Sequence, residues 1–479
     1  MHIIDILIFV FYMVAMLGVG FYFLRKNSGV DDYYVGGRSM SSGHIGLSVV
    51  ATDVGGGFSI GLGGLGFTIG LSGSWMLFTG LIGAWLAAVF LIPKIKGNPA
   101  FAKFHTFPQL FEYFYDRKVA LIAGLISAVG YLGFTSSQIL AGAKLASGTF
   151  VDLDMNMALW IMGIVAVVYT VMGGIKAVIY TDTIQWIILM AGLVFIGIPM
   201  AYNSVGGWSA IQETVAPEML TFTNISWQDI VYYVVTIIPI WFVGMTLYQR
   251  IYASRDVKTA KRAWFIAGLF EWPIMAFMGV ALGLMAKVAA DQGMFDYLGP
   301  ANISQTDPEQ GLPMLLRTIL PTGLLGLMMS AYFSAILSTA DSCLMASSGN
   351  IVTDFIQKFS DKFKSDKSFM RLSQWVTLAI GLIAILLASQ MTNVLNLMLY
   401  SYAFMVSGLF VPVIGGLFWK KSSPMGALMA MIFGGATTVL LSSLNVKLPY
   451  NLDPNVFGIM VSAISFIIFS ILSPKKQTQ

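Results

Sequence analysis

Thirteen apolar runs of about 20 residues occupy most of this chain, and a helix needs a run of that length to cross a bilayer. Hydrophobic residues make up 57% of the sequence and charged residues 10%, whereas soluble domains carry about 25% charged residues. The sequence therefore predicts an all-α, polytopic membrane protein and excludes a soluble domain. The expected spans are residues 3–24, 43–67, 75–95, 120–146, 156–173, 177–201, 229–248, 263–287, 321–350, 370–388, 394–416, 424–442 and 455–472.

Lysine and arginine gather in every second connecting segment. Of the 27 such residues, 23 fall on one side of the membrane if these spans are correct, three fall on the other side, and Lys144 lies within a span. Basic connecting segments stay in the cytoplasm. This asymmetry predicts a cell-membrane protein with its N-terminus outside and its C-terminus inside. The lipid bilayer is thus an expected partner, and a net charge of +4 does not suggest binding to nucleic acid.

The second span is interrupted at residues 51–59, where Asp53 and Val54 precede three consecutive glycines, residues 55 to 57. Each glycine costs about 1 kcal/mol relative to alanine in a helix interior, and a mid-bilayer aspartate costs about 2.5 to 3.5 kcal/mol. These costs favour a discontinuous helix whose free carbonyls face a small ligand or an ion. The alternative is a glycine-packed helix crossing that tolerates one aspartate.

A second interruption lies five spans later, where Pro239 and Gly244 bracket an apolar tetrapeptide in the seventh span. A proline kink without function is the alternative explanation. If spans two to six and seven to eleven are inverted repeats, each half begins with a broken helix, which is typical of a midplane binding site. The expected organisation is an extra helix and inner loop (1–42), a first repeat (43–201), an outer loop (202–228), a second repeat (229–416) and two final helices (417–479).

The ninth span carries a polar stripe inside hydrocarbon. At 100° per residue, three serines and an aspartate share one helical face, with a threonine beside them. Hard cations prefer such oxygen ligands. Alternatively, each hydroxyl bonds a carbonyl one turn earlier. The stripe consists of Ser334, Ser338, Thr339, Asp341 and Ser342.

Other carboxylates also lie within expected spans. Asp182 sits inside the sixth span, where a buried carboxylate needs a cation or a proton. Asp182 and Asp341 together predict an inner cation site, with Asp53 nearer the midplane. Glu271 is either a structural partner or a proton or gating group.

The sequence offers no constellation for an enzyme. His2, His44 and His105 are scattered near span ends, and Cys343 is the single cysteine, so metal-ligand spacing is lacking. We therefore expect no catalytic residues.

Four segments resemble the marker segments of the sodium:solute symporter family. They are DDYYVGGRS at 31–39, MGGIKAVIYTDTIQ at 172–185, QR at 249–250 and STADS at 338–342, and the resemblance extends over residues 3–472. It implies thirteen spans around a five-plus-five inverted-repeat core. It also implies import of a small organic solute together with Na⁺, the coupling ion, by alternating access.

The resemblance also implies which positions bind the ion. A first sodium would be held by backbone carbonyls of the broken second span and of the ninth span, and by two adjacent hydroxyls. Some members hold a second sodium just beyond those hydroxyls. The matching positions are Ala51, Val54, Ala335, Ser338 and Thr339 for the first ion, and Asp182, Ser338, Asp341 and Ser342 for the second.

The solute positions are implied in the same way. At the position of Asp53, choline carriers of the family have a cation-binding tryptophan, whereas proline carriers have an aspartate as in this chain. The expected solute is therefore an amino acid, another zwitterion, an organic cation or a carboxylate. The alternatives are a proton-coupled symporter and a transporter-derived sensor or channel. The solute-lining positions are Asp53, Phe134, Ser137, Gln138, Trp241 and Met245, and the outer-gate positions are Tyr400 and Tyr402.

Overall fold

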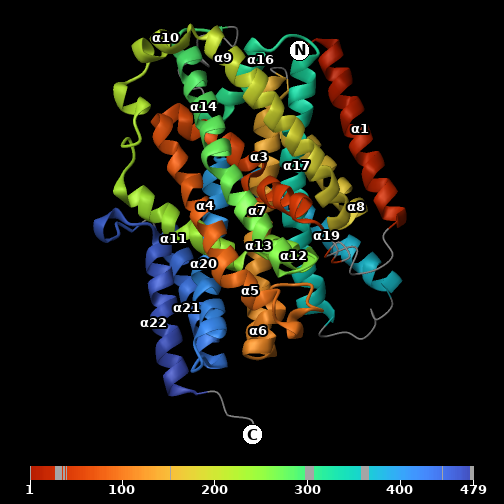
Figure 1. Ribbon diagram of the computed structural model, residues 1–479, viewed down its shortest axis with the longest axis vertical. Coiled ribbons are helices and arrows are strands. Elements are labelled where there is room, and N and C mark those ends of the chain that lie inside the picture. Colours follow the sequence, from red (N-terminus) through yellow and green to blue (C-terminus); the bar gives the residue numbers. More distant parts are fainter. Residues whose placement is uncertain are drawn as a thin grey trace.

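The computed structural model is a bundle of long helices joined by short connections (Figure 1). It describes residues 2–26, 35, 38, 40–150, 153–296, 307–357, 366–444 and 446–474; within the helices, the side chains of residues 17, 20, 23–26, 53, 54, 56–58, 173–184, 366 and 367 lie outside this description. The described secondary structure is helical apart from one isolated bridge between Met40 and Ser254. The expected all-α class is confirmed.

The helices follow one another as the apolar runs predict, and short π-helical turns join several of them. Their bounds are α1 Ile3–Lys26, α3 Ser42–Ile69, α4 Trp75–Leu86, α5 Ile92–Ile95, α6 Pro108–Phe114, α7 Arg117–Thr149, α8 Met155–Gly192, α9 Ile198–Ser204, α10 Gly207–Thr214, α11 Trp227–Val243, α12 Met245–Ala253, α13 Val257–Leu269, α14 Ala276–Asp291, α16 Pro308–Ile319, α17 Leu324–Gly349, α19 Asp366–Ala388, α20 Val394–Phe418, α21 Pro424–Ser443 and α22 Pro454–Leu472.

Ten described helical segments are long and apolar enough to cross a membrane, or up to eleven when α11 and α12, bent by 41°, form one span. The polytopic architecture is confirmed, and the count of thirteen stays a prediction. The sequence predicts separate spans at 156–173 and 177–201. The structure has candidate spans Met155–Met172 and Gln185–Ser204 there, on the continuous helix α8 and its extension α9.

Both predicted helix breaks are present. In α3 the backbone leaves helical geometry at Gly55, with φ 29° and ψ −174°. Between α11 and α12 it is extended at Gly244, with φ −67° and ψ 112°, five residues after Pro239 inside α11. A glycine fits the first break because an L side chain rarely adopts that positive φ.

The broken helix α3 lies at the centre of the bundle, in contact with α8, α13, α14, α16 and α17. Helix α1 lies along one edge, and α21 and α22 lie at the other, packed on α20 (Figure 1). Helix α3 therefore contacts helices from both halves of the chain.

Two helices begin earlier than their apolar pattern predicts. The amphipathic helix α16 begins at Pro308, four residues before the apolar residues at 312, and the span expected at 263 begins with α13 at Val257. Aspartate caps explain both shifts, because Asp307 accepts a bond from the backbone N of Glu309 and Asp256 from that of Thr259.

Candidate functional site

The break in α3 lies directly against α17. A Cβ atom placed on Gly55 would lie 2.1 Å from the Thr339 Oγ1 atom, so the two helices approach each other closely only because residue 55 lacks a side chain. A break also ends the helical hydrogen-bond ladder and leaves carbonyls of the preceding turn available to other partners. The sequence-predicted break therefore does face the sequence-predicted polar stripe.

The hydroxyl of Thr339 connects the two helices. It donates to the Ala51 carbonyl oxygen over 3.0 Å and to the Ala335 carbonyl oxygen over 3.2 Å, and all three residues are buried. Ser338, the neighbouring position, is 3% exposed, and Val54 is the last α3 residue before the break; its side chain lies outside the described part. Four of the five predicted first-site residues are therefore buried where α3 meets α17.

This oxygen set fits a hard monovalent cation. Two ligands of one ion are about 3 Å apart when each lies about 2.4 Å from it at an angle of about 75°. The measured separations from the Thr339 hydroxyl are 3.0 and 3.2 Å. Neutral carbonyls and hydroxyls suit a weakly bound ion that must be released in each cycle.

The predicted second site is only partly visible. Asp182 is in α8, but its side chain lies outside the described part of the chain. Asp341 accepts a hydrogen bond from Thr170 of α8, which brings α17 and α8 together. The Ser342 hydroxyl lies 3.4 Å from that of Thr52 and accepts a bond of 2.9 Å from Arg250.

Arg250 is a buried cation that sequence reasoning did not assign to the site. Its guanidinium donates to the hydroxyls of Ser48 and Thr52 on α3, to the Ser342 hydroxyl on α17 and to the Thr246 carbonyl on α12. One fully buried side chain therefore joins three helices. The sequence feature that could have identified Arg250 is its charge, because a cation next to a helix break needs a buried set of hydrogen-bond acceptors.

The predicted solute positions on α7 lie near two tyrosines. The Phe134 ring meets the Tyr402 ring edge-to-face at 4.9 Å, and the Tyr131 hydroxyl lies 3.0 Å from that of Thr246, just after the α11–α12 break. Ser137 donates to a carbonyl of its own helix, and the Gln138 amide donates to Ser137. The α7 positions, the second break and α20 are therefore brought together.

Other predicted solute and gate positions lie elsewhere. The Trp241 ring lies against Gly83 of α4 and Trp264 of α13, and the Met245 sulfur accepts a bond from the Phe107 backbone N. Tyr400 is 52% exposed whereas Tyr402 is 2% exposed, because residues two apart point to different helix faces. The side chain of Asp53 lies outside the described residues.

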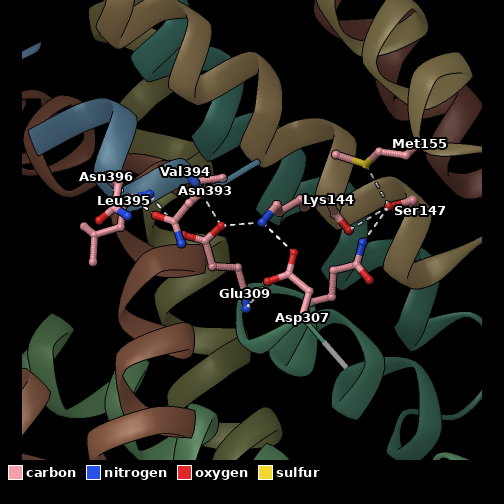
Figure 2. Close-up of polar contacts among 10 residues, drawn as sticks. Lys144, Ser147, Met155, Asp307, Glu309, Asn393, Val394, Leu395 and Asn396 are labelled. Carbon is pink, nitrogen blue, oxygen red and sulfur yellow. Dashed lines mark hydrogen bonds and ion pairs between the residues drawn. The ribbon is translucent and has the colours of Figure 1, made fainter. Parts of the chain in front are cut away.

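A second buried polar network, not predicted as a site, ties α7, α16 and α20 (Figure 2). The Lys144 ammonium lies 2.6 Å from the Glu309 carboxylate and 2.5 Å from that of Asp307. The Glu309 carboxylate also accepts bonds from the first backbone N–H groups of α20, at Val394 (2.9 Å) and Leu395 (3.0 Å). We call this set the Lys144–Glu309 latch. The sequence feature that could have identified this network is a lysine inside an apolar run.

Glu271 is a buried carboxylate at the turn between α13 and α14. A Cβ on Gly80 of α4 would lie 1.9 Å from its Oε2 atom, so the carboxylate is aimed at α4. The helix is interrupted next to it, at Trp272. Its role, as a structural partner or as a proton or gating group, stays a prediction.

The model of the sodium:solute symporter family matches residues 33–434. The chain belongs to the sodium:solute symporter family. The predicted resemblance is thereby confirmed, and so is the expectation that the protein is a transporter rather than an enzyme.

Several known transporters match along almost the whole chain. The high-affinity proline transporter of Bacillus subtilis is 28% identical over 478 residues, covering 96% of both proteins. The sodium/proline symporter of Escherichia coli is 25% identical and covers 97% of this chain and 92% of its own. A structure of a Na⁺-coupled sialic acid symporter in a substrate-bound, outward-open state superimposes with a TM-score of 0.81 at 25% identity, covering 99% of both chains.

Membership in the sodium:solute symporter family establishes what this protein does. It is a multi-pass membrane symporter that couples import of a small solute to sodium, and its helical fold is that of sodium-coupled secondary transporters. Sodium is thus the coupling ion, as predicted.

Proposed function

We propose that sodium binds between the broken helix α3 and α17, at the carbonyls of Ala51, Val54 and Ala335 and the hydroxyls of Ser338 and Thr339. The observation that carries this proposal is the Thr339 hydroxyl, which lies 3.0 Å from the Ala51 carbonyl across the two helices. An ion there would replace a hydrogen bond by a bridge between α3 and α17. Sodium-dependent uptake by purified protein in liposomes, compared between wild type and a Thr339 variant, tests the assignment.

The coupling follows from differential binding. An ion shifts a conformational equilibrium only as far as it binds one state better than the other. A sodium held by both helices favours the state in which α3 and α17 stay together and prepares the neighbouring solute site. Each inward-moving charge also gains about 2.3 kcal/mol per 100 mV of membrane potential.

A second sodium at Asp182, Ser338, Asp341 and Ser342 is a further part of the proposal. Its least favourable member is Ser342, whose hydroxyl already accepts a bond from the Arg250 guanidinium. A cation at that hydroxyl would have to displace the guanidinium or share the oxygen with it. The sodium-to-solute ratio from reversal potentials decides between one and two ions.

For the solute we propose a small zwitterion of proline's chemical class, bound between α3, α7 and α12. The support is the match to proline transporters and the aspartate at position 53. The solute's ammonium group would lie next to the Asp53 carboxylate, and its apolar ring would pack against the Phe134 ring. Competition of labelled proline uptake by choline, a monocarboxylate and sialic acid separates this class from the other expected solutes.

We propose that alternating access of the solute site to the two sides of the membrane uses two buried clusters. Arg250 ties the first half of α3 to α12 and α17, and the Lys144–Glu309 latch ties α7 to α16 and α20. We place the latch on the outer side and Arg250 on the inner side, with the N-terminus outside, in the lipid bilayer of a cell membrane. The repeats would then be 43–201 and 229–416, flanked by 1–42, the loop 202–228 and 417–479.

A further inference from the structure

An open cleft on the outside of the bundle combines a cationic rim with an apolar floor. It has a volume of about 820 Å³ and lies along α13, beside Trp85 of α4. It is separate from the ion and solute positions described above. The residues that line it are Trp85, Val257, Lys258, Lys261, Arg262, Phe265, Ile266 and Leu269.

The cleft follows one face of α13. Residues 258, 261, 262, 265, 266 and 269 are spaced at intervals that fall on the same side of a helix. The cations occupy the first two turns, and Phe265, Ile266 and Leu269 occupy the next two. The row is about 16 Å long at 1.5 Å per residue, so charge gives way to hydrocarbon within one cleft.

The side chains of this face are turned away from the protein core. Phe265 is 37% exposed, Leu269 is 53% exposed and Trp85 is 41% exposed. The Trp85 ring packs edge-to-face on Phe265 at 5.8 Å, and its Nε1 donates to the Phe265 carbonyl over 3.3 Å. The apolar end of the cleft is therefore built by two helices that are held together, and it is open on its outer side.

The three cations lack an acidic partner within the described part of the chain. The acidic residue just before α13, Asp256, pairs instead with Arg255 at 3.3 Å and caps α13 through the backbone N of Thr259. Helix α13 begins a candidate membrane span, Val257–Asp291. The cations therefore lie where the span enters the bilayer, with the apolar floor deeper in the membrane.

We propose that this cleft is a binding site for an anionic phospholipid. Lys258, Lys261 and Arg262 would bind the headgroup phosphate, and Phe265, Leu269 and Trp85 would contact the first part of an acyl chain. Basic pockets between membrane helices bind acidic headgroups in this way, and tryptophan is enriched at the same depth. A soluble phosphate would use the cations but leave the apolar floor exposed, so the lipid is the occupant that matches the whole cleft.

The test measures lipid binding rather than transport, so its result is independent of the proposed ion and solute sites. Purified protein in detergent is titrated with phosphatidylglycerol or phosphatidylcholine and analysed by native mass spectrometry. The triple variant Lys258→Gln, Lys261→Gln, Arg262→Gln is expected to bind phosphatidylglycerol about 100-fold more weakly, because each cation near an anionic surface contributes a factor of about 5.

A matched control removes the same charge elsewhere. Lys103, Lys420 and Lys421 are exposed cations that do not line the cleft, and their triple glutamine variant is expected to bind like wild type. The single variants Arg262→Gln and Lys258→Gln, each expected to weaken binding about 5-fold, replace the triple variant if it does not fold.

Four outcomes overturn the proposal. Unchanged phosphatidylglycerol binding in the cleft variants does so, and so does equal loss in the control. If phosphatidylcholine binds as tightly as phosphatidylglycerol, the charge of the headgroup has no role in binding. If glycerol 3-phosphate competes as well as the lipid does, the cleft is a soluble-anion site and the lipid assignment is wrong.

Discussion

Replacement of Thr339 by valine removes one hydroxyl from the junction of α3 and α17 and keeps the shape of the side chain. In the ion-free protein the variant loses one O–H donor, which the Ala51 and Ala335 carbonyls share as a bifurcated hydrogen bond. Each neutral bond contributes about 0.5 to 1.5 kcal/mol. In the sodium-bound protein the variant loses an oxygen bound to a charge, worth about 1.5 to 3 kcal/mol.

The difference between the two losses sets the expected change in sodium affinity. The loss is about 0.5 to 1.5 kcal/mol without the ion and about 1.5 to 3 kcal/mol with it, so sodium binding is weakened by about 1 to 1.5 kcal/mol. At 1.4 kcal/mol per factor of ten, the sodium concentration for half-maximal uptake rises about 5- to 12-fold. The maximal rate at saturating sodium is expected to change much less.

The assay is solute uptake into proteoliposomes as a function of external sodium at constant ionic strength. Thr377→Val is the matched control, because Thr377 is fully buried and its hydroxyl bonds only a carbonyl of its own helix, at Ser373. The control should keep the wild-type sodium dependence. Equal sodium dependence in Thr339→Val and wild type would refute the assignment of this hydroxyl.

Four further outcomes are expected. Asp182→Ala should lower the sodium-to-solute ratio, measured by reversal potential, from two to one; an unchanged ratio removes the second ion. Gly55→Ala should raise the sodium requirement more than 10-fold, because its Cβ would lie 2.1 Å from the neighbouring threonine hydroxyl, at a φ of 29° that L residues avoid. Lys144→Met should destabilise the protein by about 3 kcal/mol, since it leaves Glu309 buried without its counter-charge, and adding Glu309→Gln should recover part of that loss in thermal unfolding. Burial lowers the pKa of Lys96 to about 8, below its usual 10.5. The unfolded chain therefore holds more protons from pH 8 to 10.5, and stability should rise with pH there in wild type but less in Lys96→Met.

The helix breaks could be predicted because their signals are local. Three consecutive glycines after Asp53 and the Pro239–Gly244 pair disrupt helix geometry without help from the rest of the fold, and the structure has a break at each place. The contact between α3 and α17 could also be predicted from the sequence, because the polar stripe around Thr339 is costly in a membrane unless it meets another polar group.

The clusters that were missed depend on partners far apart in the sequence. The acceptors of Arg250 come from residues 48, 52, 246 and 342, and no sequence pattern places them together. Lys144 stood out as a charge within a span, but its partner Glu309 lies 165 positions later, in the short helix α16. Which face of a helix turns inward, as for Trp241 or Tyr400, is likewise decided by tertiary packing.

Binding of radioactive sodium-22 to purified protein without solute tests the central claim most directly. The account predicts saturable binding that unlabelled sodium displaces and potassium does not, and that is more than 10-fold weaker in folded Gly55→Ala while Thr377→Val keeps the wild-type affinity. Wild-type binding in folded Gly55→Ala would contradict the account, because the ion would then lie away from the junction of α3 and α17.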